Sequence, residues 1–256
     1  MISLRDRLTF AAALMLVLPA GAYAHGPQIQ AGVENGRIVT HELFLDEPYQ
    51  DPTAAQRVFE IPLGQRSLGD ANDGWYAEPN HDDAPFTGPG IALLDGQFAA
   101  GSNLRVSYLD GLKIWNGSGF VDPGAAQVEA STSALFTPST VTTDSGPFGS
   151  VALAAVTAMP DEHKTIRWRL LGDGVSPNTP SDDGVYLLAL QLSTDQAGVS
   201  PSEPYYFLLD KDASASDQSA ALAAVQSLVP EPSVLGIIAV GGWFLRRGRR
   251  RTDRDI

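Results

Sequence analysis

Aspartate and histidine are the residues of this sequence whose types and spacing suggest chemistry. Asp161 and His163 stand two positions apart at the entry of a predicted strand, so both side chains are expected on its polar face. Carboxylate and imidazole both suit zinc, which takes about four ligands in a structural site. The other histidines of the chain are His25, His41 and His81. We therefore predict a metal site assembled from separated segments, with His25, His41, His81, Asp161 and His163 as candidate ligands.

Each of the other three histidines has its own reason for being a candidate. As the first residue of a mature chain, His25 would place a free α-amine beside its imidazole, and these two groups together chelate a metal. His41 alternates with apolar residues along its strand, a pattern that also fits a hydrogen-bonded histidine facing the interior. His81 is followed by two aspartates within the polar stretch 67–90, and such a loop can close over a cation.

The charge balance limits the partners of the protein. Residues 25–229 contain 26 acidic and 9 basic side chains, a net charge near −17, whereas the whole chain is at −13. A surface this acidic repels nucleic acid and attracts cations. The chain has no cysteine, which rules out disulfides and thiolate metal sites. With imidazole and carboxylate as ligands, Zn²⁺ is the first candidate ion, and Cu²⁺ and Ca²⁺ are the alternatives.

Short apolar stretches separated by Gly, Pro, Asp, Asn and Thr are typical of strands joined by turns. Nearly every position of Val185 to Leu192 is apolar, which predicts a strand that is covered on both faces. We expect an all-β fold, either an antiparallel β-sandwich or two small β lobes that meet near residue 140. The candidate strands are residues 37–45, 57–63, 103–109, 128–136, 151–158, 165–171, 185–193 and 204–209.

One predicted strand alternates between large apolar and basic residues. Ile166, Trp168 and Leu170 are expected to face the core, with Arg167 and Arg169 on the opposite face. The two candidate ligands at the entry of this strand share that opposite, polar face.

The beginning of the chain has the three parts of a secretory signal peptide. Arg5 and Arg7 form a basic start, Leu8 to Leu18 is apolar, and Ala22 and Ala24 supply the small residues of a cleavage site. The apolar run is too short for a permanent membrane span. We expect signal peptidase to remove this signal helix, so that the mature chain begins directly after Ala24.

The end of the chain also has three ordered parts. Pro230, Glu231 and Pro232 precede an apolar stretch, Ser233 to Leu245, and a cluster of arginines within residues 246–251. This arrangement resembles the PEP-CTERM sorting signal of exported proteins of Gram-negative bacteria. The resemblance implies transient insertion of a hydrophobic sorting helix into the inner membrane, processing by an exosortase, and delivery to the cell surface or extracellular matrix. The expected divisions are a signal peptide (1–24), a β-rich metal-binding body (25–212), an Ala/Ser-rich linker (213–229) and a sorting tail (230–256).

The second half of the body carries a further resemblance. His163 is followed by Trp168 on a strand and then by Gly184-Val185-Tyr186, which opens the next strand. This order is similar to a module of metal-associated, surface-anchored bacterial proteins, in which a His-x-His pair precedes the aromatic residue. Asp161 stands at the position of the first histidine of that pair, and a carboxylate there implies a weaker or different site.

Other segments resemble PEP-CTERM proteins whose genes are repressed by the zinc-uptake regulator. Mature chains of that group open with His-Gly, followed by Gly-Val-x-x-Gly and by Thr-His. The matching positions here are His25-Gly26, Gly32 to Gly36, and Thr40-His41, and residues 112–120 resemble the middle region of the group. The resemblance implies a non-catalytic, exported zinc-binding protein that captures or stores Zn²⁺ when zinc is scarce.

Two other functions stay open at this point. A mature N-terminal His25 with a second histidine can form a copper brace for oxidative cleavage of polysaccharides, and an acidic body also suits a matrix or adhesion module. The sequence has no Gly-x-Ser-x-Gly, no phosphate-binding glycine loop and no His-Glu-x-x-His, so our leading expectation is that the protein is not an enzyme. Asn116-Gly117-Ser118 matches the glycosylation sequon, and we interpret it as a plain turn.

Overall fold

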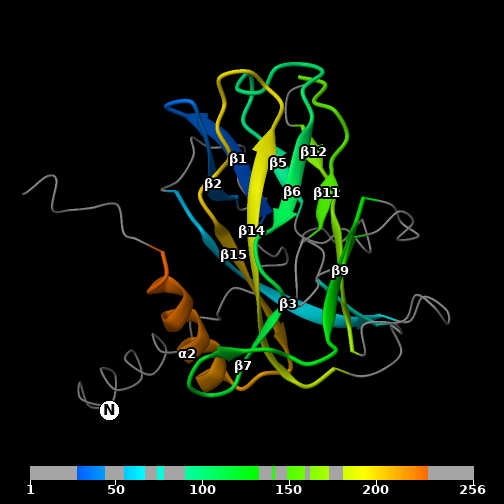
Figure 1. Ribbon diagram of the computed structural model, residues 1–256, viewed down its shortest axis with the longest axis vertical. Coiled ribbons are helices and arrows are strands. Elements are labelled where there is room, and N and C mark those ends of the chain that lie inside the picture. Colours follow the sequence, from blue (N-terminus) through cyan, green and yellow to red (C-terminus); the bar gives the residue numbers. More distant parts are fainter. Residues whose placement is uncertain are drawn as a thin grey trace, which may run out of the picture.

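The computed structural model describes residues 28–43, 55–66, 74–77, 90–132, 140–141, 149–158, 162–172 and 181–229. Within these ranges the chain is mostly β-structure with one helix, and two sheets of four and eleven strands form the body (Figure 1). The predicted signal helix and sorting helix, together with His25, His81 and Asp161, lie outside the described residues.

The smaller sheet has the strand order β12-β5-β1-β2. Its strands are β1 (Gln28–Glu34), β2 (Arg37–Leu43), β5 (Ile91–Leu93) and β12 (His163–Lys164). The pairs β1–β2 and β5–β12 are antiparallel, but β1 and β5 run parallel. Parallel partners need a long connection between them, and the alternation of residues within a strand does not report the direction of a distant partner. The prediction of purely antiparallel sheets is therefore wrong.

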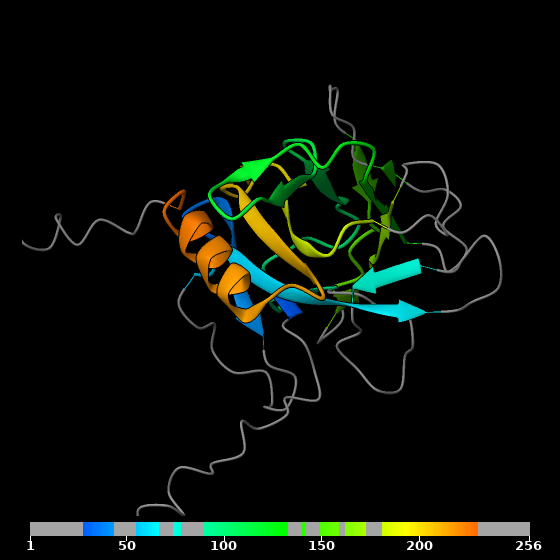
Figure 2. The same cartoon turned by 90° about the horizontal axis from the view of Figure 1, so that it is seen from below.

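The larger sheet follows the order β10-β9-β13-β4-β3-β15-β14-β6-β11, with the β7–β8 hairpin attached to β14. Here β3 and β15 are parallel and the other pairs are antiparallel. Viewed from below, the strands curl around a common core (Figure 2). The strand bounds are β3 (Val58–Arg66), β4 (Gly74–Ala77), β6 (Leu104–Tyr108), β7 (Lys113–Trp115), β8 (Phe120–Val121), β9 (Gln127–Ser131), β10 (Thr140–Val141), β11 (Ser150–Ala152), β13 (Arg167–Leu171), β14 (Gly184–Thr194) and β15 (Tyr205–Lys211).

The apolar run predicted to be covered on both faces is β14, and the structure confirms this. Leu188, Leu190 and Leu192 point into the main core, together with Tyr186. Val185 and Leu187 point to the opposite face, where they join a second, smaller cluster beneath the helix. A strand with apolar contacts on both sides needs apolar side chains at nearly every position.

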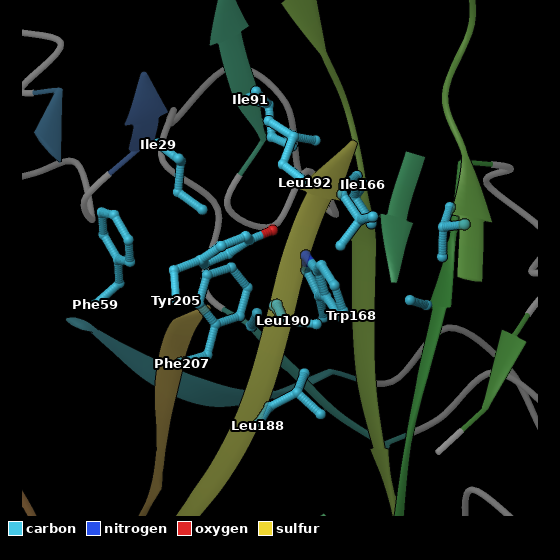
Figure 3. Close-up of a cluster of buried hydrophobic side chains, with 14 of the residues drawn as sticks. Ile29, Phe59, Ile91, Ile166, Trp168, Leu188, Leu190, Leu192, Tyr205 and Phe207 are labelled. Atoms are coloured by element: carbon cyan, nitrogen blue, oxygen red, sulfur yellow. The ribbon is translucent and has the colours of Figure 1, made fainter. Parts of the chain in front are cut away.

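The main core joins side chains from both sheets. Ile29 and Ile91 of the smaller sheet point into the same cluster as Trp168 and Phe207 of the larger one (Figure 3). The rings of Trp168 and Phe207 meet edge to face, with centroids 5.2 Å apart, a favourable geometry for two buried aromatic rings. This shared core fixes how the smaller sheet, which carries the candidate metal ligands, sits against the rest of the body.

The alternating strand is β13, and the faces predicted for its own residues are confirmed. His163, predicted at the entry of this strand, lies instead in β12 of the smaller sheet. Trp168 and Leu170 are buried in the main core. Arg169 points to the other face, where it is also buried, and its Nε donates a 2.9 Å hydrogen bond to Glu129 of β9. A basic residue in an alternating strand thus identifies the face that turns away from the core, but not whether that face meets water.

The Ala- and Ser-rich segment forms helix α2 (Ala215–Gln226). Ser214 caps its N-terminus, because the hydroxyl accepts a hydrogen bond from the backbone of Asp217. Ala221 and Val225 are buried where the helix packs on β3, β14 and β15 (Figure 1). The segment is therefore a packed element of the body. Whether residues 213–229 also link the body to the sorting tail stays a prediction, since residues 230–256 lie outside the described part.

Candidate metal centre

The β1–β2 hairpin brings a histidine and a glutamate to one face of the smaller sheet. Its turn consists of Asn35 and Gly36, with φ of 50° and 77°. Positive φ at both positions is the conformation that an Asn-Gly pair adopts most readily in a two-residue hairpin. The turn sets the register, with Glu34 opposite Arg37, and this register places His41 on the same face as Glu34.

His41 and Glu34 lie in contact on that face. His41 Nε2 is 3.4 Å from Glu34 Oε1, and their side chains are 3% and 53% exposed, respectively. Gly32 lies between them on the same face. The imidazole is thus enclosed, while the carboxylate reaches solvent.

The separation of these two atoms fits joint binding of one metal ion. A tetrahedral ion with bonds of about 2.1 Å holds neighbouring donor atoms about 3.4 Å apart. The same spacing also suits a histidine–glutamate contact without metal, in which the two side chains attract each other once the imidazole is protonated. One imidazole nitrogen and one carboxylate oxygen supply half of a zinc coordination shell.

The loop after β5 packs directly on this face of the hairpin, and Gly32 makes the contact possible. A Cβ atom on Gly32 would lie 2.5 Å from Leu94 Cδ1 and 2.8 Å from Gln97 Oε1. The Leu94 N–H donates to the Ala31 carbonyl at 2.9 Å, and the Val33 N–H donates to Gln97 Oε1. Glycine at this position therefore lets the loop close against the strand.

The β2 edge of the hairpin is held by the segment that leads into β3. The Gln56 N–H donates to the Thr40 carbonyl at 2.8 Å, and Thr40 Oγ1 donates to the Gln56 carbonyl at 2.6 Å. Near the turn, Arg37 forms an ion pair with Glu203. Contacts on both edges hold His41 and Glu34 in place before any ligand arrives, which favours binding.

His163 lies far from this pair although it belongs to the same sheet. The pairing register runs in one row from His163 through Ala92 and Gln30 to His41. Strand spacings of about 4.8 Å put the Cα atoms of the two histidines about 14 Å apart. His163 is exposed on β12 at the edge of the sheet, whereas His41 is buried. The structure therefore does not bring these two predicted ligands together.

Glu162, which precedes His163, has a structural role. Its carboxylate accepts hydrogen bonds from the backbone of Thr157 at 2.8 Å and of Ala158 at 3.0 Å, and from Lys164 Nζ at 2.5 Å. Burial tends to raise the pKa of Glu162, but the hydrogen bonds from Lys164 and Thr157 outweigh it, so the pKa is lowered. These contacts tie β12 to the segment that follows β11.

The other predicted ligands do not complete a site within the part of the chain that the structure describes. His25, His81 and Asp161 lie outside that part. Inside it, no group of three or more His, Asp or Glu side chains is arranged to hold a metal ion.

The same described ranges contain no helix that is long and apolar enough to cross a membrane. The sorting residues Pro230, Glu231 and Pro232 also lie outside them.

Comparison with protein-family models, with curated proteins and with solved structures finds no match to this chain. The resemblances to sorted and zinc-regulated proteins therefore stay predictions from the sequence.

Glu34 is the candidate ligand that the sequence analysis does not include. The Asn35-Gly36 dipeptide in the sequence indicates a two-residue hairpin turn. Such a turn sets Glu34 opposite Arg37 and so fixes every further residue pair along the two strands. Counting along that register puts Glu34 and His41 on one face. Period-two reasoning within a single strand does not reveal this relationship.

Proposed function

We propose that this protein is an exported, surface-sorted zinc-binding protein that captures or stores Zn²⁺ when zinc is scarce, and that it is not an enzyme. The observation that carries the proposal is the contact between His41 and Glu34, two zinc-binding groups held 3.4 Å apart on a rigid hairpin. We expect the remaining ligands to come from His25, His81, Asp161 or water. The sandwich arrangement of the two sheets also belongs to the proposal.

The electrostatics around the pair support a cation as the ligand. Arg37 lies opposite Glu34 in the register, but its guanidinium pairs with Glu203. Among the described residues, the Glu34 carboxylate pairs with His41. A body with a net charge near −17 adds a field that attracts a divalent cation.

The ends of the chain support export and sorting. Signal peptidase would expose the α-amine of His25, and an exosortase would process the tail that begins at Pro230-Glu231-Pro232. The protein would then reach the cell surface or the extracellular matrix of a Gram-negative bacterium. Zinc capture at that location needs no thiolate, which agrees with a chain that has no cysteine.

Titration calorimetry with Zn²⁺ tests this proposal on protein that begins at the native His25 without a tag. We expect Glu34→Gln to weaken binding at least about tenfold, because the amide replaces an anionic ligand while its neighbours stay in place. Glu60→Gln is the matched control, since Glu60 is an exposed glutamate on β3 in the other sheet. We expect this control to bind zinc as the unmodified protein does.

Two results would overturn the proposal. Absence of zinc binding by the unmodified protein would refute the function itself. Equal affinities for Glu34→Gln and the unmodified protein would refute the role of the His41–Glu34 pair and would move the site to other candidates. Thermal unfolding of each variant shows whether a loss of binding reflects a loss of fold.

A further inference from the structure

The tip of the β7–β8 hairpin holds an asparagine side chain in a particular set of hydrogen bonds. Asn116 Oδ1 accepts bonds from Ser118 N, Ser118 Oγ and Gly119 N, each at 3.0 Å. The Asn116 N–H donates to the Gly119 carbonyl at 3.0 Å, which confirms the predicted turn. Asn116, Gly117 and Ser118 are all exposed, so water reaches the amide group.

We infer that Asn116 is a site of spontaneous deamidation, a modification that needs water as its only co-reactant. In this reaction the backbone nitrogen of Gly117 attacks Cγ of Asn116 and gives up its proton to solvent. The bond from Cγ to Nδ2 then breaks, ammonia leaves, and a five-membered succinimide remains. Water opens this ring at either carbonyl and yields aspartate or isoaspartate, with no oxidation or reduction.

Three donors on Oδ1 favour the attack. Negative charge develops on Oδ1 as the new bond to Cγ forms, and donors already aimed at that atom stabilise the charge without reorganising. Two backbone N–H groups and one hydroxyl thus point at Oδ1, the same kinds of donor that form an oxyanion hole. The Ser118 hydroxyl is the donor that a side-chain substitution can remove.

The attacking residue is also unhindered. Gly117 has φ of +91°, and within the described part of the chain no atom beyond its two chain neighbours lies within 4 Å of the place where a Cβ would stand. The tip can therefore change its backbone conformation, as closure of the succinimide ring requires, without meeting a neighbouring segment. The new carboxylate of the product would then stand on an exposed turn.

The chain contains a natural comparison, the Asn35-Gly36 pair in the β1–β2 turn. There the Gly36 carbonyl accepts a 2.8 Å hydrogen bond from Ser200 N, and a Cβ on Gly36 would lie 3.2 Å from the Gly198 carbonyl. This turn is therefore held against another segment, whereas among the described residues no segment packs against Gly117. The same dipeptide should react more slowly at Asn35, because its backbone cannot rearrange as freely.

The test is prolonged incubation of the folded mature protein in buffer near neutral pH, followed by mass spectrometry of proteolytic fragments. We expect conversion of amide to carboxyl at Asn116 well before conversion at Asn35. Ser118→Ala removes one donor and should slow the reaction at Asn116 by about three- to tenfold, the effect of one neutral hydrogen bond. Faster reaction at Asn35, or an unchanged rate in Ser118→Ala, would overturn the inference.

Discussion

His41 Nε2 and Glu34 Oε1 lie 3.4 Å apart although seven positions separate the two residues in the chain. The Asn35-Gly36 turn folds β2 back on β1 and sets the register that puts both residues on one face. The contact is thus a product of the turn and of the register that it fixes. It is the feature of the described residues on which the proposed zinc site depends.

Gly32 should be essential to the hairpin. We expect Gly32→Ala to lower the free energy of unfolding by about 1 to 3 kcal/mol, because the added methyl group forces Leu94 and Gln97 away from β1. Gly119→Ala is the matched control, since no atom of the described residues beyond its two chain neighbours lies within 4 Å of its Cβ position. Urea unfolding measures both variants. Equal free energies of unfolding would show that the loop after β5 can move away from β1 without loss of stability.

Breaking the buried ion pair between Arg169 and Glu129 should cost more stability than breaking the exposed pair between Arg37 and Glu203. Glu129→Gln replaces the carboxylate that pairs with the buried guanidinium by a neutral amide, and we expect a loss of about 3 kcal/mol in the free energy of unfolding. Glu203→Gln makes the same chemical change at the surface and should cost less than about 1 kcal/mol. Similar losses in both variants would mean that burial does not govern the strength of these pairs.

Glu162 should make stability depend on acid pH. Its pKa is lower in the folded chain than the ordinary value of 4.5, so its contribution is present above that value and is lost as pH falls through the folded pKa. We expect Glu162→Gln to lower the free energy of unfolding by about 1 to 3 kcal/mol near neutral pH. The difference from the unmodified protein should shrink below pH 4.5, and a constant difference would contradict this role.

The mature chain should begin at His25 and lack the arginine cluster of the tail. The small residues Ala22 and Ala24 predict the first cut, and Pro230-Glu231-Pro232 predicts the second. Mass spectrometry of the protein recovered from the surface of a host that has an exosortase checks both ends. A mature protein that retains Met1 would remove His25 as an N-terminal chelator, and one that retains the arginines would contradict sorting.

Patterns within one segment predict the parts of the fold that depend on that segment alone. The apolar run of β14 and the alternation of Trp168 and Leu170 in β13 report burial correctly, because each reflects contacts along one strand. The parallel pairs β1–β5 and β3–β15 join segments that are distant in sequence. Their direction depends on the path of the whole chain, which no local pattern encodes.

The candidate site is predictable only in part for the same reason. Its sequence context makes His41 a candidate ligand. In the structure His41 is buried on one face of the smaller sheet, and Ile29 and Ile38 join the main core from the opposite face. Asp161 and His163 stand two positions apart in the sequence, which predicts both in one site with His41, but the register places His163 three strands from His41. The sequence identifies residues that could bind a metal, but the strand register determines which of these side chains come into contact.

NMR of the imidazole nitrogens during a Zn²⁺ titration tests the central claim most directly. The experiment uses isotope-labelled protein that begins at the native His25, so that each of the four histidines reports separately. If His41 and Glu34 hold the ion, His41 Nε2 should shift to the position of a metal-bound nitrogen, and Glu34→Gln should weaken that response. Saturation with zinc while the His41 resonances stay unchanged would contradict the account and assign the metal to another histidine.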